Sequence, residues 1–247
     1  MSTIYRPWPD KWLAERSFFD FICLPLQHLT LNNMKKILII SPHADDEILG
    51  CGGYMLKEIK RGASVHIIYG TIGGKDARQN IDERMAEVRA VTAELGATFS
   101  VIAYNHDTLL DTLPSVDIIS TLDKEIAALE PHEVFVNYPS NHQDHIKLYQ
   151  CAVTAMRLKE GYIPPFFALY EYPFITSNDR LNGGMYYYNI SDCIDKKIKL
   201  FEMYKSQVKT SPSPLNATGI RSLAAMRGLE AGCPFAEKFY IQRLYKE

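Results

Sequence analysis

Residues 35–53, KKILIISPHADDEILGCGG, determine how the rest of the chain is interpreted. The stretch opens with a continuous apolar run, which is typical of a strand buried on both faces in a parallel sheet. One histidine and three consecutive acids, His43 and Asp45 to Glu47, follow it directly, and a glycine-rich segment comes next. Neighbouring carboxylates repel one another and resist burial. Because α/β proteins keep their chemistry at the carboxyl ends of strands, this cluster is a candidate functional site.

The segments that follow alternate between the two periodicities of regular structure. Apolar runs predict further strands at 64–70, 98–104, 133–138, 166–172, 185–190 and 238–245. Helical spacing predicts helices at 50–61, 80–96, 115–129, 191–207 and 219–230, and a further helix that follows PSNHQDH and runs to about residue 157. This alternation indicates an α/β fold with a mostly parallel sheet and helices on both faces.

Length and composition restrict the class of protein. The 247 residues suffice for one large α/β domain, and the net charge of −2 without a basic block argues against nucleic-acid or membrane partners. No apolar run reaches the roughly 18 residues of a membrane span. The five cysteines are scattered without a C-x-x-C pair, so we expect a reducing cytoplasm rather than a disulfide framework. The oligomeric state stays open, and a homo-oligomer is compatible with the sequence.

The first 33 residues precede the regular pattern and form an N-terminal extension. The segment FFDFICLPL has some character of a signal peptide, but Asp20 and Pro25 interrupt it and no small-residue cleavage site follows. We expect instead a short helix that packs its aromatic side chains on the main domain, namely Trp8, Trp12, Phe18, Phe19 and Phe21.

A second polar cluster, His142-Gln143-Asp144-His145, follows the predicted strand at 133–138. Carboxyl ends of parallel strands share one edge of a sheet, so the two clusters can meet. Catalytic zinc typically takes three nitrogen or oxygen ligands and keeps one open position. His43, one of the two adjacent aspartates and one of the two later histidines would complete such a set, and the other aspartate is a candidate general base. The alternative is a helix N-cap whose acids favour the helix dipole.

At these residues the chain resembles a known family. PHADDEILGCGG resembles the P-H-P-D-D-E signature of the LmbE-like (PIG-L) N-acetylglucosaminyl deacetylases, and HQDH resembles their second signature, H-x-D-H. The segments GTIGG, ERMAEVRAVTAELGA and RGLEAGCPFAEKF are similar to family segments in the same order. The resemblance covers roughly residues 34–240, so we expect residues 34–247 to form a single LmbE-like domain.

The resemblance implies a Rossmann-like three-layer sandwich that hydrolyses the acetamide of an amino sugar with one divalent metal, usually zinc. By position, the metal ligands would be His43, Asp46 and His145. Asp45 would be the general base, and His142 would stabilise the oxyanion or protonate the departing amine. Asp144 would hold the ring of His142 in place.

The chain departs from the family pattern at two points. Ala44 replaces the usual proline, which loosens the turn but removes no functional group. Some members assist the oxyanion with a tyrosine or arginine just before the second motif. Here Pro139-Ser140-Asn141 occupies that stretch, which leaves Asn141 and Tyr138 as candidates.

Other residues carry weaker expectations. For Glu47 we expect a capping or supporting role, and close packing explains the glycine-rich segment better than a dinucleotide loop does. Arg84 is either a substrate-binding residue or half of a surface ion pair. The YEYPF stretch at 170–174 is a candidate for stacking on a sugar ring, and the loop TSPSPLNATG is a candidate lid. Glu237, in the segment that resembles the end of the family domain, has no evident chemical role.

The sequence thus predicts a cytoplasmic, zinc-dependent hydrolase of linear amides that removes acetyl from an N-acetylated sugar or sugar conjugate; other divalent metals are compatible. One alternative is a metal-dependent phosphoesterase, because acids and histidines at strand ends also hold two-metal sites. Another is a non-catalytic sugar- or nucleotide-binding protein of the same fold. The number of metal ions per chain and the release of acetate separate the three.

Overall fold

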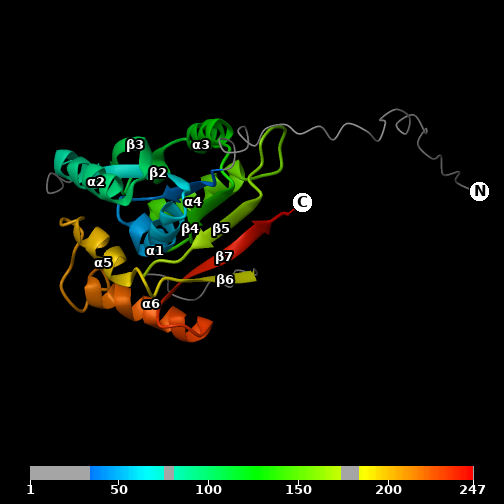
Figure 1. Ribbon diagram of the computed structural model, residues 1–247. Coiled ribbons are helices and arrows are strands. Elements are labelled where there is room, and N and C mark those ends of the chain that lie inside the picture. The colour runs from blue at the N-terminus through cyan, green and yellow to red at the C-terminus, as the bar shows by residue number, and fades with distance from the viewer. Residues whose placement is uncertain (1–33, 75–80, 174–183, 247) are drawn as a thin grey trace, which may run out of the picture. The chain divides into compact units, whose positions relative to one another are not determined.

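A seven-stranded sheet forms the centre of the computed structural model, which describes residues 34–74, 81–173 and 184–246 (Figure 1). The helix expected within the first 33 residues lies outside these ranges. In chain order, the elements are β1 (Lys36–Ser41), α1 (Asp46–Lys60), β2 (Ser64–Gly74), α2 (Ile81–Leu95), β3 (Thr98–Asp107), η1 (Leu110–Thr112), α3 (Ser115–Leu129), β4 (Glu133–Asn137), α4 (Gln143–Ala155), β5 (Phe166–Tyr170), β6 (Gly184–Asn189), α5 (Ile194–Glu202), α6 (Ala217–Ala231) and β7 (Ala236–Leu244).

The order of strands in the sheet is β3-β2-β1-β4-β5-β7-β6. Strands β1 to β5 pair in parallel, while β7 runs antiparallel to both β5 and β6. The first strand is central, with β2 on one side and β4 on the other. This topology confirms the predicted α/β fold with a mostly parallel sheet.

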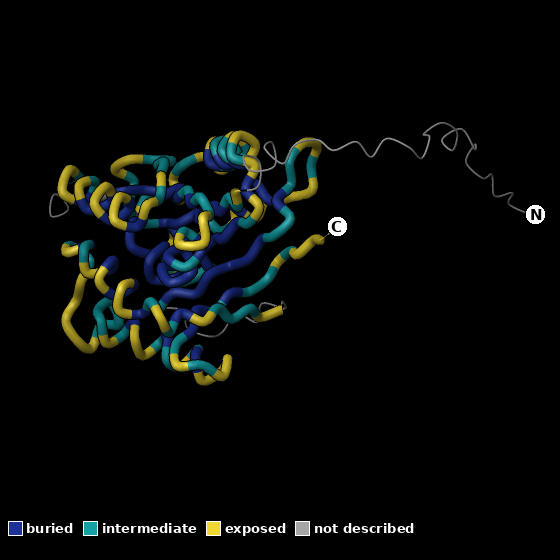
Figure 2. The backbone as a smooth tube through the Cα atoms, in the orientation of Figure 1, coloured by how far each residue is buried: buried dark blue, intermediate teal, exposed yellow. Residues whose placement is uncertain are grey.

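Helices cover both faces of the sheet and give three layers. The alternating side chains of β1 separate two cores: Ile37 and Ile39 belong to the core under α1, α2, α5 and α6, while Leu38 and Ile40 belong to the core under α3 and α4. Burial on both faces explains why the apolar run is continuous. Figure 2 shows this pattern, with buried strands inside and exposed residues on the outer sides of the helices. None of the described helices is long and apolar enough to cross a membrane.

Two predicted helices have different bounds in the structure. Helix α1 begins at Asp46, not at residue 50, so the acids form its first turn and the glycines lie inside it. A side chain at Gly50 would place its Cβ 2.1 Å from Cδ2 of Tyr170, so the glycine is required by close packing rather than by a turn. The predicted helix at 191–207 is shorter, because α5 ends at Glu202 and the chain then turns back toward α1 and α2.

The topology places the two polar clusters at one edge of the sheet. Strands β1 and β4 are neighbours and run in the same direction, with Ile40 opposite Val136. The segments that follow them therefore leave the sheet at the same edge. The first leads into α1 and the second into α4.

Candidate active site

The turn between β1 and α1 carries His43, Asp45 and Asp46, and the two aspartates are buried. Asp45 has a φ of 138°, a conformation that L residues adopt only under constraint. Two backbone contacts hold the turn locally: Ser41 Oγ donates to the carbonyl of His43 at 2.9 Å, and the N–H of His43 donates to Asp46 Oδ2 at 3.2 Å.

The turn between β4 and α4 carries His142, Asp144 and His145. His142 is the N-cap of α4, and its Nδ1 accepts a hydrogen bond from the backbone N–H of Asp144 at 3.2 Å. Asn137, the last residue of β4, donates from Nδ2 to the carbonyl of His145 at 3.1 Å. Helix capping thus places two histidines at the start of α4.

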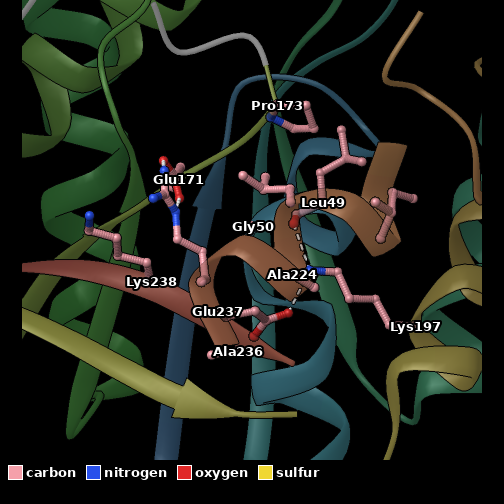
Figure 3. A pocket seen from close by; sticks show the side chains of 12 residues that line it. Leu49, Gly50, Glu171, Pro173, Lys197, Ala224, Ala236, Glu237 and Lys238 are labelled. Atoms are coloured by element: carbon pink, nitrogen blue, oxygen red, sulfur yellow. Dashed lines mark hydrogen bonds and ion pairs between the residues drawn. The ribbon is translucent and has the colours of Figure 1, made fainter. Parts of the chain in front are cut away.

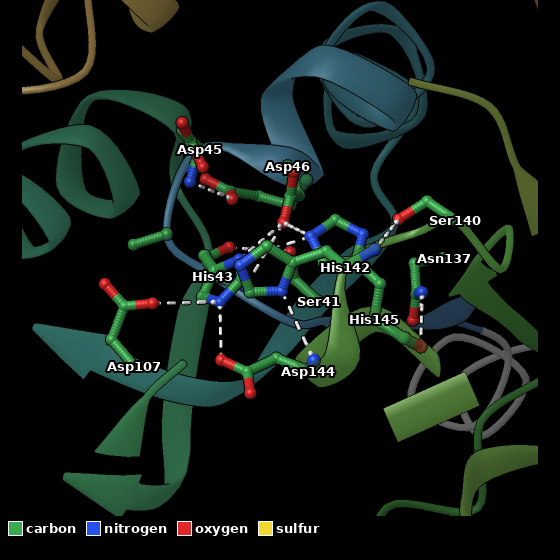
Figure 4. Close-up of polar contacts among 12 residues, drawn as sticks. Ser41, His43, Asp45, Asp46, Asp107, Asn137, Ser140, His142, Asp144 and His145 are labelled. Atoms are coloured by element: carbon green, nitrogen blue, oxygen red, sulfur yellow. Dashed lines mark hydrogen bonds and ion pairs between the residues drawn. The ribbon is translucent and has the colours of Figure 1, made fainter. Parts of the chain in front are cut away.

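Three side chains from the two turns converge on one point (Figure 4). Asp46 Oδ2 lies 3.4 Å from Nδ1 of His43 and 3.2 Å from Nε2 of His145. The two histidine nitrogens are themselves 3.2 Å apart. Tetrahedral zinc with bonds of about 2.0 Å separates its ligands by about 3.3 Å. The donor set and its spacing therefore fit a single zinc ion held by the three residues that the sequence analysis selected.

Two wider groups of candidate ligands also include His43. One combines it with His142 and His145, and the other with Asp107, His142 and Asp144; in each group the ligand atoms lie within 4.8 Å of one another. We favour the triangle with Asp46, because all its sides match the spacing of a tetrahedral site. In addition, Asp107 and Asp144 approach His43 from Nε2, the nitrogen that points away from the triangle.

We expected the carboxylate of Asp144 to hold the ring of His142, but it contacts His43 instead. Its Oδ2 lies 3.0 Å from Nε2 of His43, and its two oxygens accept from the N–H groups of Thr108 and Leu110 at 2.7 and 2.9 Å. The contact with His142 is made by the Asp144 backbone. A carboxylate on the far nitrogen of a ligating histidine fixes its tautomer and raises its basicity. Asp144 thus orients His43.

A cavity of about 300 Å³ opens beside the triangle. Its lining includes all three triangle residues together with Asp45 and His142. The remaining lining residues are Leu49, Arg84, Asp107, Thr108, Tyr172, Gln207 and Leu215. The wall therefore combines a cation, several acids and apolar patches within one small-molecule-sized space.

The surroundings of the two aspartates separate their pKa values. Burial raises the pKa of Asp45, and the charge of Asp46 raises it further, against the opposing charge of Arg84. Burial also acts on Asp46, but the charges and hydrogen bonds of His145 and His43 outweigh it and lower the pKa of that carboxyl. The low pKa suits Asp46 to metal ligation, since a ligand must be deprotonated.

Glu47 supports the strained turn rather than lining the cavity. It is fully buried, and its Oε2 accepts from the backbone N–H of Asp45 at 2.9 Å. Its other oxygen accepts from the hydroxyl of Tyr204 at 2.6 Å. Burial raises the pKa of Glu47 to about 7, although the Tyr204 hydrogen bond opposes the shift. This is the supporting role that we expected for Glu47.

Several weaker expectations now have a structural answer. Arg84 is buried, not half of a surface pair: it donates to the carbonyl of Ala44 and lines the cavity. Tyr172 also lines the cavity and packs against His145, with ring centroids 4.8 Å apart. Leu215, within the candidate lid, forms part of the wall.

The two candidates for assisting the oxyanion do not line the cavity. Asn141 is exposed. Tyr138 is buried in the core under α3 and α4, where it packs against Tyr240. Sequence reasoning missed Asp107, the last residue of β3, whose Oδ1 lies 3.3 Å from Nε2 of His43. Its position at the carboxyl end of a parallel strand was the available signal.

Comparison with known proteins assigns the class. The sequence profile of the PIG-L family, described as GlcNAc-PI de-N-acetylase, matches residues 38–156. The uncharacterized deacetylase YaiS of Escherichia coli K12 is 30% identical over 135 residues, which cover 51% of this chain and 70% of that protein. A 1D-myo-inositol 2-acetamido-2-deoxy-alpha-D-glucopyranoside deacetylase of Mycobacterium sp. JLS is 21% identical, covering 72% of this chain and 76% of that one. The chain belongs to the PIG-L (LmbE-like) family of deacetylases.

Solved structures show the same fold. The N,N'-diacetylchitobiose deacetylase of Pyrococcus horikoshii superimposes with a TM-score of 0.70 at 24% identity and covers 84% of both chains. GalB of Pseudomonas putida KT2440, a 4-carboxy-2-hydroxymuconate hydratase, gives a TM-score of 0.70 at 18% identity, covering 87% of this chain and 99% of that one. One fold thus carries two reactions, so the activity has to be argued from the site.

Proposed function

We propose that this protein is a zinc-dependent hydrolase that removes the N-acetyl group from an amino sugar or a sugar conjugate. The observation that carries the proposal is the triangle of His43, Asp46 and His145, with spacings of 3.2–3.4 Å, beside a cavity that Asp45 and His142 also line. Membership in a deacetylase family supports the reaction type.

When bound at the triangle, zinc would polarise the acetyl carbonyl and lower the pKa of water. Asp45 is not part of the triangle and lines the same cavity, so its carboxylate is free to accept the proton of the attacking water. Its strained backbone, held by Glu47 and Arg84, directs it there.

Of the two roles considered for His142, the geometry favours stabilisation of the acetyl oxygen. The Asp144 N–H donates to Nδ1 of His142, which places the proton of a neutral ring on Nε2. That N–H can stabilise negative charge on the acetyl oxygen. An amine leaves badly from an amide, and the proton that Asp45 has accepted from the water can be passed on to it.

The rest of the cavity suits a sugar. Arg84 and Asp107 offer a donor and an acceptor for hydroxyl groups, and the ring of Tyr172 offers an apolar face. The names of the family and of the diacetylchitobiose deacetylase support an N-acetylated amino sugar as the substrate class.

The proposal also extends to organisation and location. We assign the catalytic domain to residues 34–247 and regard residues 1–33 as an addition, which the match at 38–156 supports. A cytoplasmic location is supported by free thiols at all four cysteines among the described residues.

Acetate release tests the activity. Zinc-loaded protein is incubated with a panel of N-acetylated amino sugars, free and nucleotide-linked, and liberated acetate is measured. Acetate from at least one sugar supports the proposal. Phosphate release from sugar phosphates with two ions per chain favours the phosphoesterase, and sugar binding without turnover favours the non-catalytic alternative. Either result would contradict the deacetylase.

Metal content tests the ligand set. Wild-type protein is expected to hold one zinc ion per chain after dialysis, and His145→Ala is expected to lose it, because one corner of the triangle is removed. Replacement of His66, which bonds to Thr98 and Ser100 away from the cavity, is the matched control. Full metal content in His145→Ala would show that the ligand set is wrong.

A further inference from the structure

Glu237, for which the sequence offers no role, forms a buried ion pair with Lys197 of α5 (Figure 3). The two residues are only 4% and 3% exposed, and Lys197 Nζ lies 2.7 Å from Glu237 Oε1. The carboxylate also accepts from the backbone N–H groups of Gly53 and Tyr54, both at 2.7 Å. Lys197 in turn donates to the carbonyl of Leu49 at 2.7 Å.

Two of these contacts involve a backbone donor and a backbone acceptor of α1 that are four residues apart, the N–H of Gly53 and the carbonyl of Leu49. In a regular α-helix the N–H of Gly53 would bond to the carbonyl of Leu49. Here Glu237 binds that N–H, and Lys197 binds that carbonyl. The ion pair therefore bridges this donor and this acceptor.

The glycines of α1 let the pair approach the helix closely. A Cβ at Gly52 would lie 3.1 Å from Cγ of Lys197. One at Gly53 would lie 3.1 Å from Oε1 of Glu237 and 2.4 Å from Cγ2 of Ile190. Larger residues at these positions would push the pair away from the helix.

A short chain of hydrogen bonds connects the pair to the candidate active site. Leu49 accepts from Lys197 through its carbonyl and donates through its N–H to the carbonyl of Asp45 at 3.0 Å. Leu49 also lines the cavity. Only two backbone-mediated contacts therefore separate Lys197 from the residue that precedes the ligand Asp46.

We propose that Lys197 and Glu237 are positioning residues that set the first turn of α1 so that Asp46 reaches the metal and Asp45 faces the cavity. This inference rests on the proposed function. A buried ion pair gains little net stability, because desolvation offsets its attraction. A role in geometry, rather than in stability alone, explains why the buried pair is bound to the backbone of α1.

The double variant Lys197→Met/Glu237→Met tests this role. The N–H of Gly53 and the carbonyl of Leu49 are each other's partners in a regular α-helix, and an apolar pair often replaces a buried ion pair without loss of stability. We expect a folded protein whose zinc affinity, measured by competition with a chromophoric chelator, is about 10–100-fold weaker. The visible spectrum of the cobalt-loaded variant should change as well, because it reports ligand geometry.

Lys35→Met, just before β1, is the matched control, because it removes an ion pair to the same helix. Lys35 pairs with Glu58 near the other end of α1, at 2.9 Å. We expect this variant to keep the wild-type zinc affinity and cobalt spectrum. Unchanged affinity and spectrum in the double variant, or an equal loss in Lys35→Met, would overturn the positioning role.

These readouts do not depend on acetate release. A wild-type protein that binds zinc but deacetylates no sugar would contradict the proposed function and still leave the positioning role to be decided by affinity. A double variant that binds zinc like the wild type would overturn the positioning role and leave the proposed function standing.

Discussion

The turn that starts α1 and the turn that starts α4 bring the same kinds of side chain to one cavity, but they are stabilised differently. At α4, His142 has an ordinary extended backbone, and its contacts come from Ser140 and Asp144, two residues away on either side. At α1, Asp45 has a φ of 138°, and the support comes from distant parts of the chain. Arg84, Lys197 and Tyr204 provide it.

This difference follows from what each turn has to do. A strained non-glycine residue costs about 1–3 kcal/mol and persists only where the surroundings determine it. The α1 turn must direct two adjacent acids to different tasks, whereas the α4 turn starts from a regular cap at His142. The first therefore depends on remote residues for its strained backbone, whereas the second forms its cap locally and uses remote contacts, from Thr108 and Leu110, for the carboxylate of Asp144.

The largest effect is expected from Asp45→Asn, which removes the candidate base from the strained turn. The amide has the same shape but cannot accept the proton, so turnover should fall by about 10²–10⁴-fold. Zinc content should stay at the wild-type level, because Asp45 is outside the triangle. Acetate release and metal analysis on the same sample check both. Normal turnover in Asp45→Asn would show that Asp45 is not the general base.

Asp144→Asn breaks the contact through which the α4 turn orients His43 of the α1 turn. The substitution keeps the shape but removes the charge beside Nε2 of His43. Zinc affinity should fall by about 10–100-fold in a chelator competition. Asp111→Asn, at an exposed acid nearby, should leave it unchanged. Equal affinities in both variants would mean that the two turns bind metal independently.

Gly50→Ala tests how closely α1 must approach the sheet. The new Cβ would lie 2.1 Å from Cδ2 of the buried Tyr170, so unfolding free energy should fall by about 1–3 kcal/mol. Gly184→Ala, which meets nothing within 4 Å, should have little effect. Urea unfolding compares the two. A Gly50→Ala protein as stable as Gly184→Ala would show that this contact can relax.

The smallest effect is expected from Tyr204→Phe, which deletes one distant support of the α1 turn. Loss of the hydroxyl that donates to Glu47 should cost about 1 kcal/mol and lower turnover as well. Tyr162→Phe loses a similar hydrogen bond, to the carbonyl of Pro131, away from the site. Tyr162→Phe should therefore lower the stability of the protein without lowering its turnover. Thermal melts and acetate assays of both variants check this, and equal activity would limit Tyr204 to stability.

Regular features of the fold could be predicted because their signals are local. The apolar run at 35–41 predicted a strand buried on both faces, and the two polar clusters after strands predicted a shared edge. Both follow from periodicity and from the direction of parallel strands. The start of α1 was placed four residues late, because glycines inside a helix have the same sequence signature as glycines in a turn.

Contacts between distant residues could not be predicted in the same way. No spacing relates Asp107 to His43, or Glu237 to Gly53, although each pair is in contact in the fold. Asp144 illustrates the same limit within a recognised motif. Asp144 is only two residues from His142 in the sequence, but its carboxylate contacts His43, 101 residues away.

By itself, then, the sequence determined which side chains are available, which strands carry them and toward which edge of the sheet they point. These properties follow from hydrophobic periodicity and strand direction, which act within a few residues. Only the tertiary structure decided the strained backbone of Asp45, the pairing of Asp144 with His43 and the contacts of Lys197 and Glu237 with the backbone of α1. Each depends on burial next to residues remote in the chain, where packing and desolvation, rather than local propensity, select the geometry.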